Sequence, residues 1–181
     1  DQPITQWEEG LEIPQGQTGE IIVKAPWVTK AYFKQEDITH LAKIPDGETF
    51  WHRMGDVGRW DEKSRLWFCG RKSHRVIIGL KTLFTIPCEA IFNQHPHVKR
   101  SALVGRGLGS KREPVIIIEP EPENSRAKDR ETFSKELLVL GATAPHTQGI
   151  KKILYYPDFP VDVRHNAKIF REKLAAWSEN Q

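Results

Sequence analysis

Three charged side chains lie in or beside segments that the sequence predicts to be turns, and each suits contact with a polar or anionic ligand. Lys168 stands where a polar, turn-prone segment meets an apolar pattern, and its ammonium is a compact charge suited to a carboxylate or phosphate oxygen. Asp56 falls in a glycine-flanked bend, and Arg71 ends a short apolar strand. Each residue taken alone is typical of a solvated surface, so the elements that position them must decide between the two interpretations.

The composition is that of an ordinary globular protein. The chain has 181 residues, 38% of them hydrophobic, with six tryptophans, which is enough for one large or two small cores. Its net charge of +3 is spread along the chain without a basic stripe, which argues against a nucleic-acid surface. No apolar run is long enough to span a bilayer, so we expect no transmembrane segment and a cytoplasmic location.

The two cysteines, Cys69 and Cys88, lie in apolar surroundings and lack the spacing of metal ligands. We therefore expect two reduced core thiols and no metal site in this sequence, which fits a reducing cytoplasm.

The first part of the chain reads as short strands separated by turns. Apolar or alternating runs predict strands over 20–24 and 66–69, and the run 50–60 predicts a strand, a tight bend at Asp56 and a second strand. Residues 28–33 suggest one helical turn. Together these patterns predict a β-rich unit over residues 1–72.

The sequence pattern changes after Arg71, and the second part, residues 73–181, is predicted to alternate helices with strands. Strands are predicted over 76–78, 98–104, 115–119 and 151–156. Three helices are predicted from apolar spacing: one capped by Thr85 with Cys88, Ile91, Phe92 and His95 on a face, one capped by Asp129 with Phe133, Leu137 and Leu140, and one with Phe170, Leu174 and Trp177. The fold class predicted for the chain is α+β.

Five short motifs occur in a fixed order, and their combination resembles one known family. They are Gly19-Glu20-Ile21-Ile22-Val23, Trp51-His52-Arg53-Met54-Gly55-Asp56, Gly70-Arg71-Lys72-Ser73, Gln94-His95-Pro96-His97-Val98 and the segment from Pro160 to Lys168. In this order they resemble the acyl-adenylate-forming enzymes, the AMP-dependent synthetase and ligase superfamily that includes acyl-CoA synthetases. The resemblance implies the end of a β-barrel-like subdomain, followed by a small, mobile lid domain.

The resemblance also implies roles for individual residues. Asp56 would accept hydrogen bonds from both ribose hydroxyls of ATP, and Gly55 would let the backbone approach the nucleotide. Arg71 would donate to the ribose or the α-phosphate. Lys168 would bridge the substrate carboxylate and the α-phosphate, while Lys72 and Ser73 would form the hinge between the two parts. The Mg²⁺ ligand and the acyl pocket of this superfamily are expected upstream of this sequence.

Several departures from the family pattern bear on the acyl acceptor. Met54 replaces the usual threonine, Ser73 replaces a common aspartate, and Asn166-Ala167 replaces the residues before the lysine. The segment after the hinge, residues 79–84, has lost the family's pattern, and of the later glutamates Glu89 remains. This segment lines the approach of the thiol in relatives that use coenzyme A, so its loss argues against thioester formation.

The segment 159–168 and the Gly-Arg-Lys-Ser-His-Arg hinge look most like the bacterial β-lactone synthetases of olefin biosynthesis. This resemblance implies a long-chain β-hydroxy acid whose own hydroxyl attacks the adenylated carboxyl, and other olefin-pathway enzymes as partners. His165 is the candidate base by its nearness to Lys168; for it, as for His74, His95 and His97, a structural role is the commoner one.

Two alternatives stay open: a long-chain fatty acyl-CoA ligase that uses coenzyme A, and a non-catalytic binding or regulatory module that keeps the fold. The sequence begins at Asp1 without methionine and opens on no self-contained pattern, so we expect a piece of a longer protein that is inactive by itself.

Overall fold

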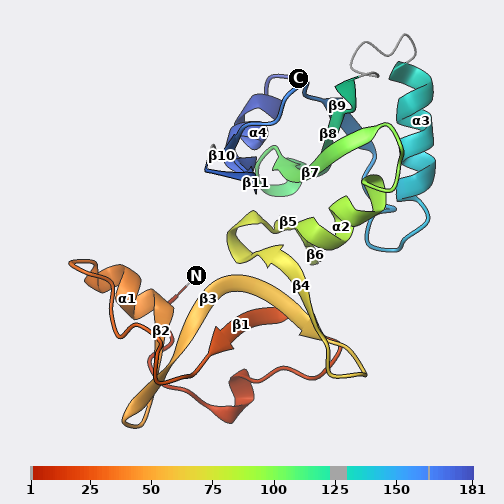
Figure 1. Ribbon diagram of the computed structural model, residues 1–181. Coiled ribbons are helices and arrows are strands. Elements are labelled where there is room, and N and C mark those ends of the chain that lie inside the picture. Colours follow the sequence, from red (N-terminus) through yellow and green to blue (C-terminus); the bar gives the residue numbers. More distant parts are fainter. Residues whose placement is uncertain (1, 123–129, 163) are drawn as a thin grey trace. The chain divides into compact units, whose positions relative to one another are not determined.

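The computed structural model describes residues 2–122, 130–162 and 164–181, and the chain divides into two compact units, Asp1–Ser73 and His74–Gln181 (Figure 1). The fold is α+β, as the sequence predicts. Within the described residues, no helix has the length and apolar character needed to cross a membrane.

The first unit is built on an antiparallel sheet. The order of its strands is β1-β3-β2, and β4 pairs with the last five residues of β3, from Asp56 to Trp60. Its elements are η1 (Glu9–Leu11), β1 (Gly19–Val23), α1 (Glu36–Ala42), β2 (Lys43–Asp46), β3 (Thr49–Trp60), β4 (Leu66–Arg71) and η2 (Lys72–His74), the last of which crosses into the second unit at His74.

The prediction of two strands separated by a bend over residues 50–60 is wrong, because strand β3 runs unbroken for 12 residues. The bend survives as a bulge: Glu20 pairs with Val57 and Ile22 with Arg53, so β3 has more residues than β1 between these pairs. Gly55 lies in the bulge at φ +68°, a conformation that glycine adopts without strain.

The helical turn predicted over residues 28–33 is wrong. The α-helix of this unit lies further on, at α1. Glu36 and Asp37 occupy its first turn, where negative side chains stabilise the positive end of the helix dipole. Thr39 Oγ1 also accepts a hydrogen bond from Tyr32 N–H at 3.0 Å, which ties the irregular segment to the helix.

The second unit is built around a three-stranded sheet of order β7-β8-β9, with β7 and β8 antiparallel and β8 and β9 parallel. Its elements are β5 (Val76–Ile78), β6 (Lys81–Leu83), α2 (Thr85–Phe92), β7 (Val98–Arg106), η3 (Gly109–Lys111), β8 (Glu113–Pro120), α3 (Arg130–Gly141), β9 (Lys152–Tyr155), β10 (Val161–Asp162), β11 (His165–Ile169) and α4 (Arg171–Ser178).

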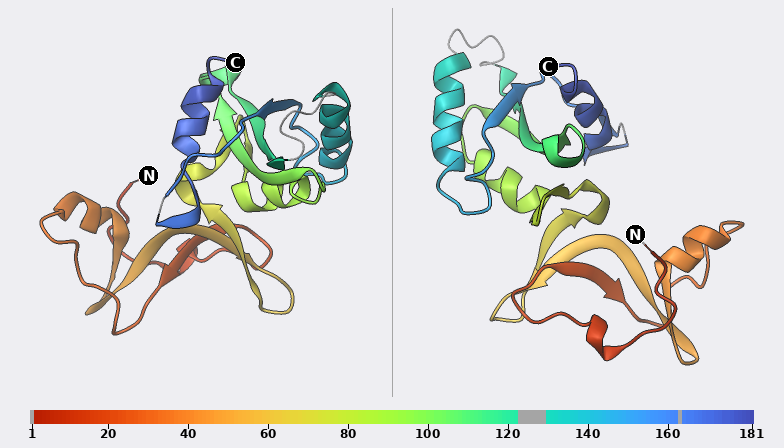
Figure 2. Two further views of the ribbon diagram at one scale, coloured as in Figure 1. Left: turned by 45° about the horizontal axis from the view of Figure 1, so that its top comes forward. Right: turned by 180° about the vertical axis from the view of Figure 1, so that it is seen from behind.

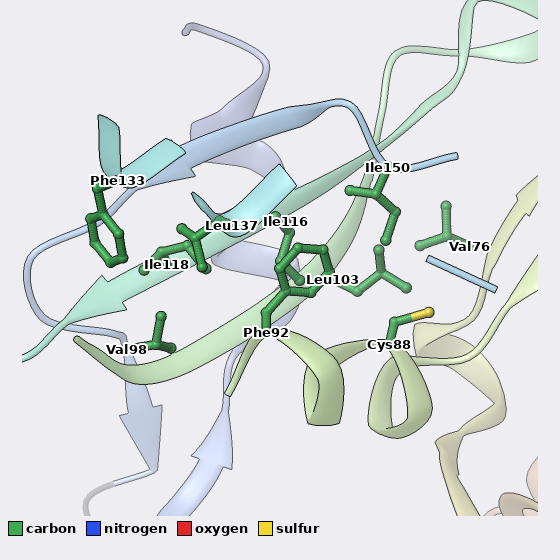
Figure 3. Close-up of a cluster of buried hydrophobic side chains, with 10 residues drawn as sticks. All are labelled: Val76, Cys88, Phe92, Val98, Leu103, Ile116, Ile118, Phe133, Leu137 and Ile150. Carbon is green, nitrogen blue, oxygen red and sulfur yellow. The ribbon is translucent and has the colours of Figure 1, made fainter. Parts of the chain in front are cut away.

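Both faces of this sheet are buried, which explains the unbroken apolar run 115–118 in β8. One face packs against α2 and α3 through Phe92, Phe133 and Leu137 (Figure 3). The other face packs against Ile169 of β11 and Leu174 of α4. Figures 1 and 2 show α3 and α4 on opposite sides of the sheet.

Two details of α2 differ from the prediction. Phe84 occupies the N-cap position without a side-chain hydrogen bond and Thr85 is the first helical residue, so Thr85 is not the cap. The helix ends at Phe92, which leaves His95 beyond it. The predicted cap Asp129 of the next helix lies outside the described residues.

Both cysteines are free and buried, as predicted. Burial raises the pKa of the Cys88 thiol to about 12, so this group packs as a small apolar side chain and is not a reactive thiolate.

Candidate active site

The residues singled out in the sequence fall into two groups, one in each unit. Asp56, Gly55, Arg71 and Lys72 belong to the first unit, and Lys168 belongs to the second.

Asp56 and Arg71 come together on neighbouring strands. They are register partners in the antiparallel pair of β3 and β4, and Arg71 Nη1 lies 3.2 Å from Asp56 Oδ1. The same nitrogen donates a hydrogen bond to the carbonyl of Met54 at 3.0 Å. The Arg71 side chain is 53% exposed and that of Asp56 24%, so both remain accessible to a ligand. An ion pair this exposed contributes little to stability, at most about 1 kcal/mol.

The residues around this pair explain its shape. Gly55 at φ +68° turns the backbone just before Asp56, and a Cβ there would lie 3.7 Å from Arg71 Nη1, an ordinary contact. The backbone conformation, and not a lack of space, therefore requires glycine at this position. Met54, which replaces a family threonine, holds Arg71 through its main-chain carbonyl, a contact that any residue type could make.

The carboxylate of Glu20 binds Lys72 near the end of the first unit, a role that the sequence did not predict. Glu20 Oε2 accepts from Lys72 Nζ at 2.7 Å and from Arg53 Nη2 at 2.8 Å, and all three side chains are less than one-fifth exposed. Burial opposes ionisation of Glu20, but the two cations outweigh it and hold the pKa of the carboxyl below its usual range. Lys72 is thus anchored, and exposed Ser73 is the last residue of the unit.

The sequence suggested that Lys168 lies at the start of a helix, and the structure shows that it does not. It lies on β11, and the helix α4 begins at Arg171. Val161 pairs with Ile169 and Asp162 with His165, so residues 166–168 bulge out between two register pairs of the hairpin. The Lys168 side chain is exposed, and this bulge presents it away from the regular ladder.

The hairpin that carries Lys168 is closed by a buried aspartate. Asp162 Oδ1 accepts from the Arg164 N–H at 2.9 Å and from its guanidinium at 3.3 Å. These hydrogen bonds and the charge of Lys168 lower the pKa of Asp162. The backbone of His165, the candidate base, lies in β11, whereas its side chain lies outside the described residues.

Two of the other histidines pack in the second unit. His95 Nε2 lies 3.2 Å from the Glu136 carboxylate, and its ring lies 4.9 Å from that of Phe133. The ring of His97 packs beside that of His95. These contacts give His95 and His97 a structural role.

No protein-family model matches the chain. The chain is 45% identical over 186 residues to the olefin beta-lactone synthetase of Xanthomonas campestris pv. campestris, an alignment that covers 100% of this chain and 33% of that protein. It is 41% identical over 183 residues to the olefin beta-lactone synthetase of Stenotrophomonas maltophilia, covering 98% of this chain and 33% of the relative. The chain therefore spans about a third of the length of these curated relatives.

Among solved structures, an anthranilate CoA ligase in complex with anthranoyl-AMP superposes with a TM-score of 0.80 at 19% identity. The superposition covers 99% of this chain and 33% of the ligase chain, which establishes a shared fold.

Proposed function

The chain belongs to the acyl-adenylate-forming, AMP-dependent synthetase and ligase superfamily and corresponds to the C-terminal portion of such proteins, and we propose that the whole protein activates a carboxylic acid with ATP. A carboxylate oxygen attacks the α-phosphorus of ATP, the bond to the bridging oxygen breaks, and acyl-AMP and pyrophosphate are formed.

The observation that carries this proposal is the pairing of Asp56 with Arg71. An accessible carboxylate and an accessible guanidinium lie side by side, the first an acceptor only and the second a donor only. Asp56 suits the two vicinal hydroxyls of a ribose, and Arg71 suits the ribose or the α-phosphate. Lys168, exposed on the bulge of β11, supplies the cation for the α-phosphate and the substrate carboxylate.

The described residues contain no group of three histidine, cysteine, aspartate or glutamate side chains placed to hold a metal ion.

We propose further that the acyl acceptor is the substrate's own β-hydroxyl, and that the substrate is a long-chain β-hydroxy acid. The hydroxyl oxygen attacks the acyl carbon, the bond to AMP breaks, the proton leaves to a base, and a four-membered lactone closes. Two relatives with 45% and 41% identity are named olefin beta-lactone synthetases, which favours this acceptor over coenzyme A. His165 remains the candidate base.

The segment after the hinge, residues 79–84, supports the same choice, because it has lost the sequence pattern that lines the approach of the thiol in relatives that use coenzyme A. Residues 79–84 form the turn after β5, with Gly79 at φ +57° and a fully exposed Leu80, and the strand β6. We place the enzyme in the cytoplasm, since buried free thiols suit a reducing compartment, with other enzymes of olefin biosynthesis as partners.

The test is to incubate the full-length protein with ATP and a long-chain β-hydroxy acid, with and without coenzyme A, and to identify products by mass spectrometry. β-Lactone and AMP without coenzyme A are the expected products. An acyl-CoA thioester formed only when coenzyme A is present would favour the fatty acyl-CoA ligase. No pyrophosphate release under any condition would favour a non-catalytic module.

A further inference from the structure

A buried ion pair in the second unit joins residues 82 positions apart. Glu89 of α2 accepts two hydrogen bonds from Arg171, at 2.6 Å from Nη2 and 3.0 Å from Nε. The side chains are 6% and 14% exposed. A fork of two parallel hydrogen bonds fixes direction as well as distance, so it holds the start of α4 against α2 in one orientation.

The same carboxylate also binds the sheet. Glu89 Oε1 accepts from the Leu103 N–H at 2.9 Å, and Leu103 lies on β7, which pairs only with β8 among the described strands. Glu89 therefore joins α2, the edge of the sheet and α4 at a single group. Burial raises the pKa of Glu89, and Arg171 and the Leu103 N–H oppose that rise.

This junction lies three residues after Lys168. Ile169 is buried against the sheet and the Phe170 N–H donates to the Pro160 carbonyl at 2.8 Å, so no loose segment separates the junction from the lysine. Lys168 itself lies in the bulge, where register pairs do not constrain it. Its position must be set by the anchored residues on either side.

We propose that Glu89 and Arg171 are positioning residues that hold the bulge of β11 so that the Lys168 ammonium reaches the reacting carboxylate and α-phosphate in the correct place. The inference rests on the proposed adenylation. A buried ion pair is a weak source of stability, because desolvation offsets the attraction. A positional role explains why two charges are kept inside the unit at this place.

The size of the expected effect follows from the sensitivity of catalysis to geometry. A displacement of about 1 Å at a catalytic group lowers the rate roughly 100-fold. The contact of Lys168 with the reacting groups strengthens as charge builds up in the transition state, so KM for ATP and for the acid is expected to change little.

The test uses the double variant Glu89→Gln/Arg171→Met of the full-length enzyme. The glutamine amide would leave an acceptor for the Leu103 N–H, and the simultaneous loss of both charges leaves neither one buried alone. We expect kcat for acid-dependent pyrophosphate exchange to fall roughly 10- to 100-fold, with KM for ATP and acid within about two-fold of wild type. Arg171→Lys keeps the charge without the fork, so its kcat is expected to lie between those of the wild type and the double variant. This single variant replaces the double variant in the test if the double variant does not fold.

Two comparisons separate positioning from a general loss of stability. Tyr155→Phe removes a hydrogen bond of 2.9 Å to Ser134 beside the cluster that packs α2 and α3 on the sheet, and kcat should be unchanged at temperatures where this variant stays folded. Adding Lys168→Ala to Glu89→Gln/Arg171→Met should lower kcat no further than Lys168→Ala alone, because the pair acts through that lysine.

Wild-type kcat in Glu89→Gln/Arg171→Met, or in Arg171→Lys if only that variant folds, would overturn the inference and leave the proposed function intact. The inference would also be overturned if Glu89→Gln/Arg171→Met lowered kcat by the same factor in the Lys168→Ala background as in the wild type. If Lys168→Ala alone had wild-type exchange activity, the proposed role of the lysine would fail, and the inference would fail with it.

Discussion

Arg71 and Asp56 face each other across two antiparallel strands, with 3.2 Å between the guanidinium and the carboxylate. Neither side chain is buried, so the pair is held in place mainly by the register of β3 and β4 and by the Met54 carbonyl. This arrangement presents an acceptor and a donor to a ligand without a large conformational change.

Replacing Asp56 with asparagine in the full-length enzyme should weaken ATP binding. A hydrogen bond to a charged group contributes about 1.5–3 kcal/mol, so we expect KM for ATP to rise roughly 10- to 100-fold. Steady-state kinetics of pyrophosphate exchange measures this change. Asp61→Asn, a change in the turn between the same two strands, is the matched control, and an equal rise in both variants would contradict the role of Asp56.

The anchoring of Lys72 by Glu20 should protect the chain from proteolysis at the end of the first unit. Glu20→Gln removes the charge that holds Lys72 and Arg53, so trypsin should cleave after Lys72 several-fold faster in the native enzyme. Cleavage after Lys63, in the exposed turn between β3 and β4, provides an internal reference. Unchanged cleavage after Lys72 relative to Lys63 would show that the anchor does not restrain this segment.

Asp61 should make the first unit sensitive to acid. Hydrogen bonds from Trp67 Nε1 and from the Arg65 backbone lower the pKa of this carboxyl from 3.8 to about 2. A carboxyl with a lowered pKa stabilises the folded state above its unfolded pKa, and this contribution is lost as the pH falls from about 4 to about 2. Unfolding midpoints measured across this range should fall less steeply for Asp61→Asn than for wild type. Parallel curves would rule out Asp61 as a source of the acid sensitivity.

The two units should differ in stability when this chain is studied by itself. Among the described residues, the buried apolar side chains of the first unit are Ile44, Val57 and Cys69, whereas the second unit has two buried clusters. Hydrophobic burial is the main favourable contribution to folding, so the first unit should unfold at lower urea. Five of the six tryptophans lie in residues 1–73, so fluorescence should change before far-ultraviolet circular dichroism is lost. Coincident transitions would contradict this expectation.

Local patterns predicted many of the elements of the second unit. The apolar run of β8 and the spacing of Phe133 and Leu137 indicated a buried strand and a helix, because burial on a sheet or helix face repeats along the chain. The family motifs placed Asp56 and Arg71 in one site, and the structure brings these two side chains together.

The features that the sequence did not predict depend on which residues pair with one another. The bulge of β11 depends on which residues pair with Val161 and Asp162, and neither pairing is visible in the local sequence. The ion pair of Glu89 with Arg171 joins positions 82 residues apart, so no local pattern signals it. Arg171 follows Lys168 by three residues, and this nearness was the one sequence signal that could have drawn attention to it.

The central claim is that Lys168 stabilises the charge that develops when acyl-AMP is formed. The most direct measurement is acid-dependent exchange of pyrophosphate into ATP by the full-length enzyme, with Lys168→Ala compared with Lys173→Ala on the nearby helix α4. Loss of a donor aimed at the developing charge should lower kcat for Lys168→Ala roughly 100- to 1,000-fold, with little change for Lys173→Ala. Exchange at the wild-type rate in Lys168→Ala would contradict the account.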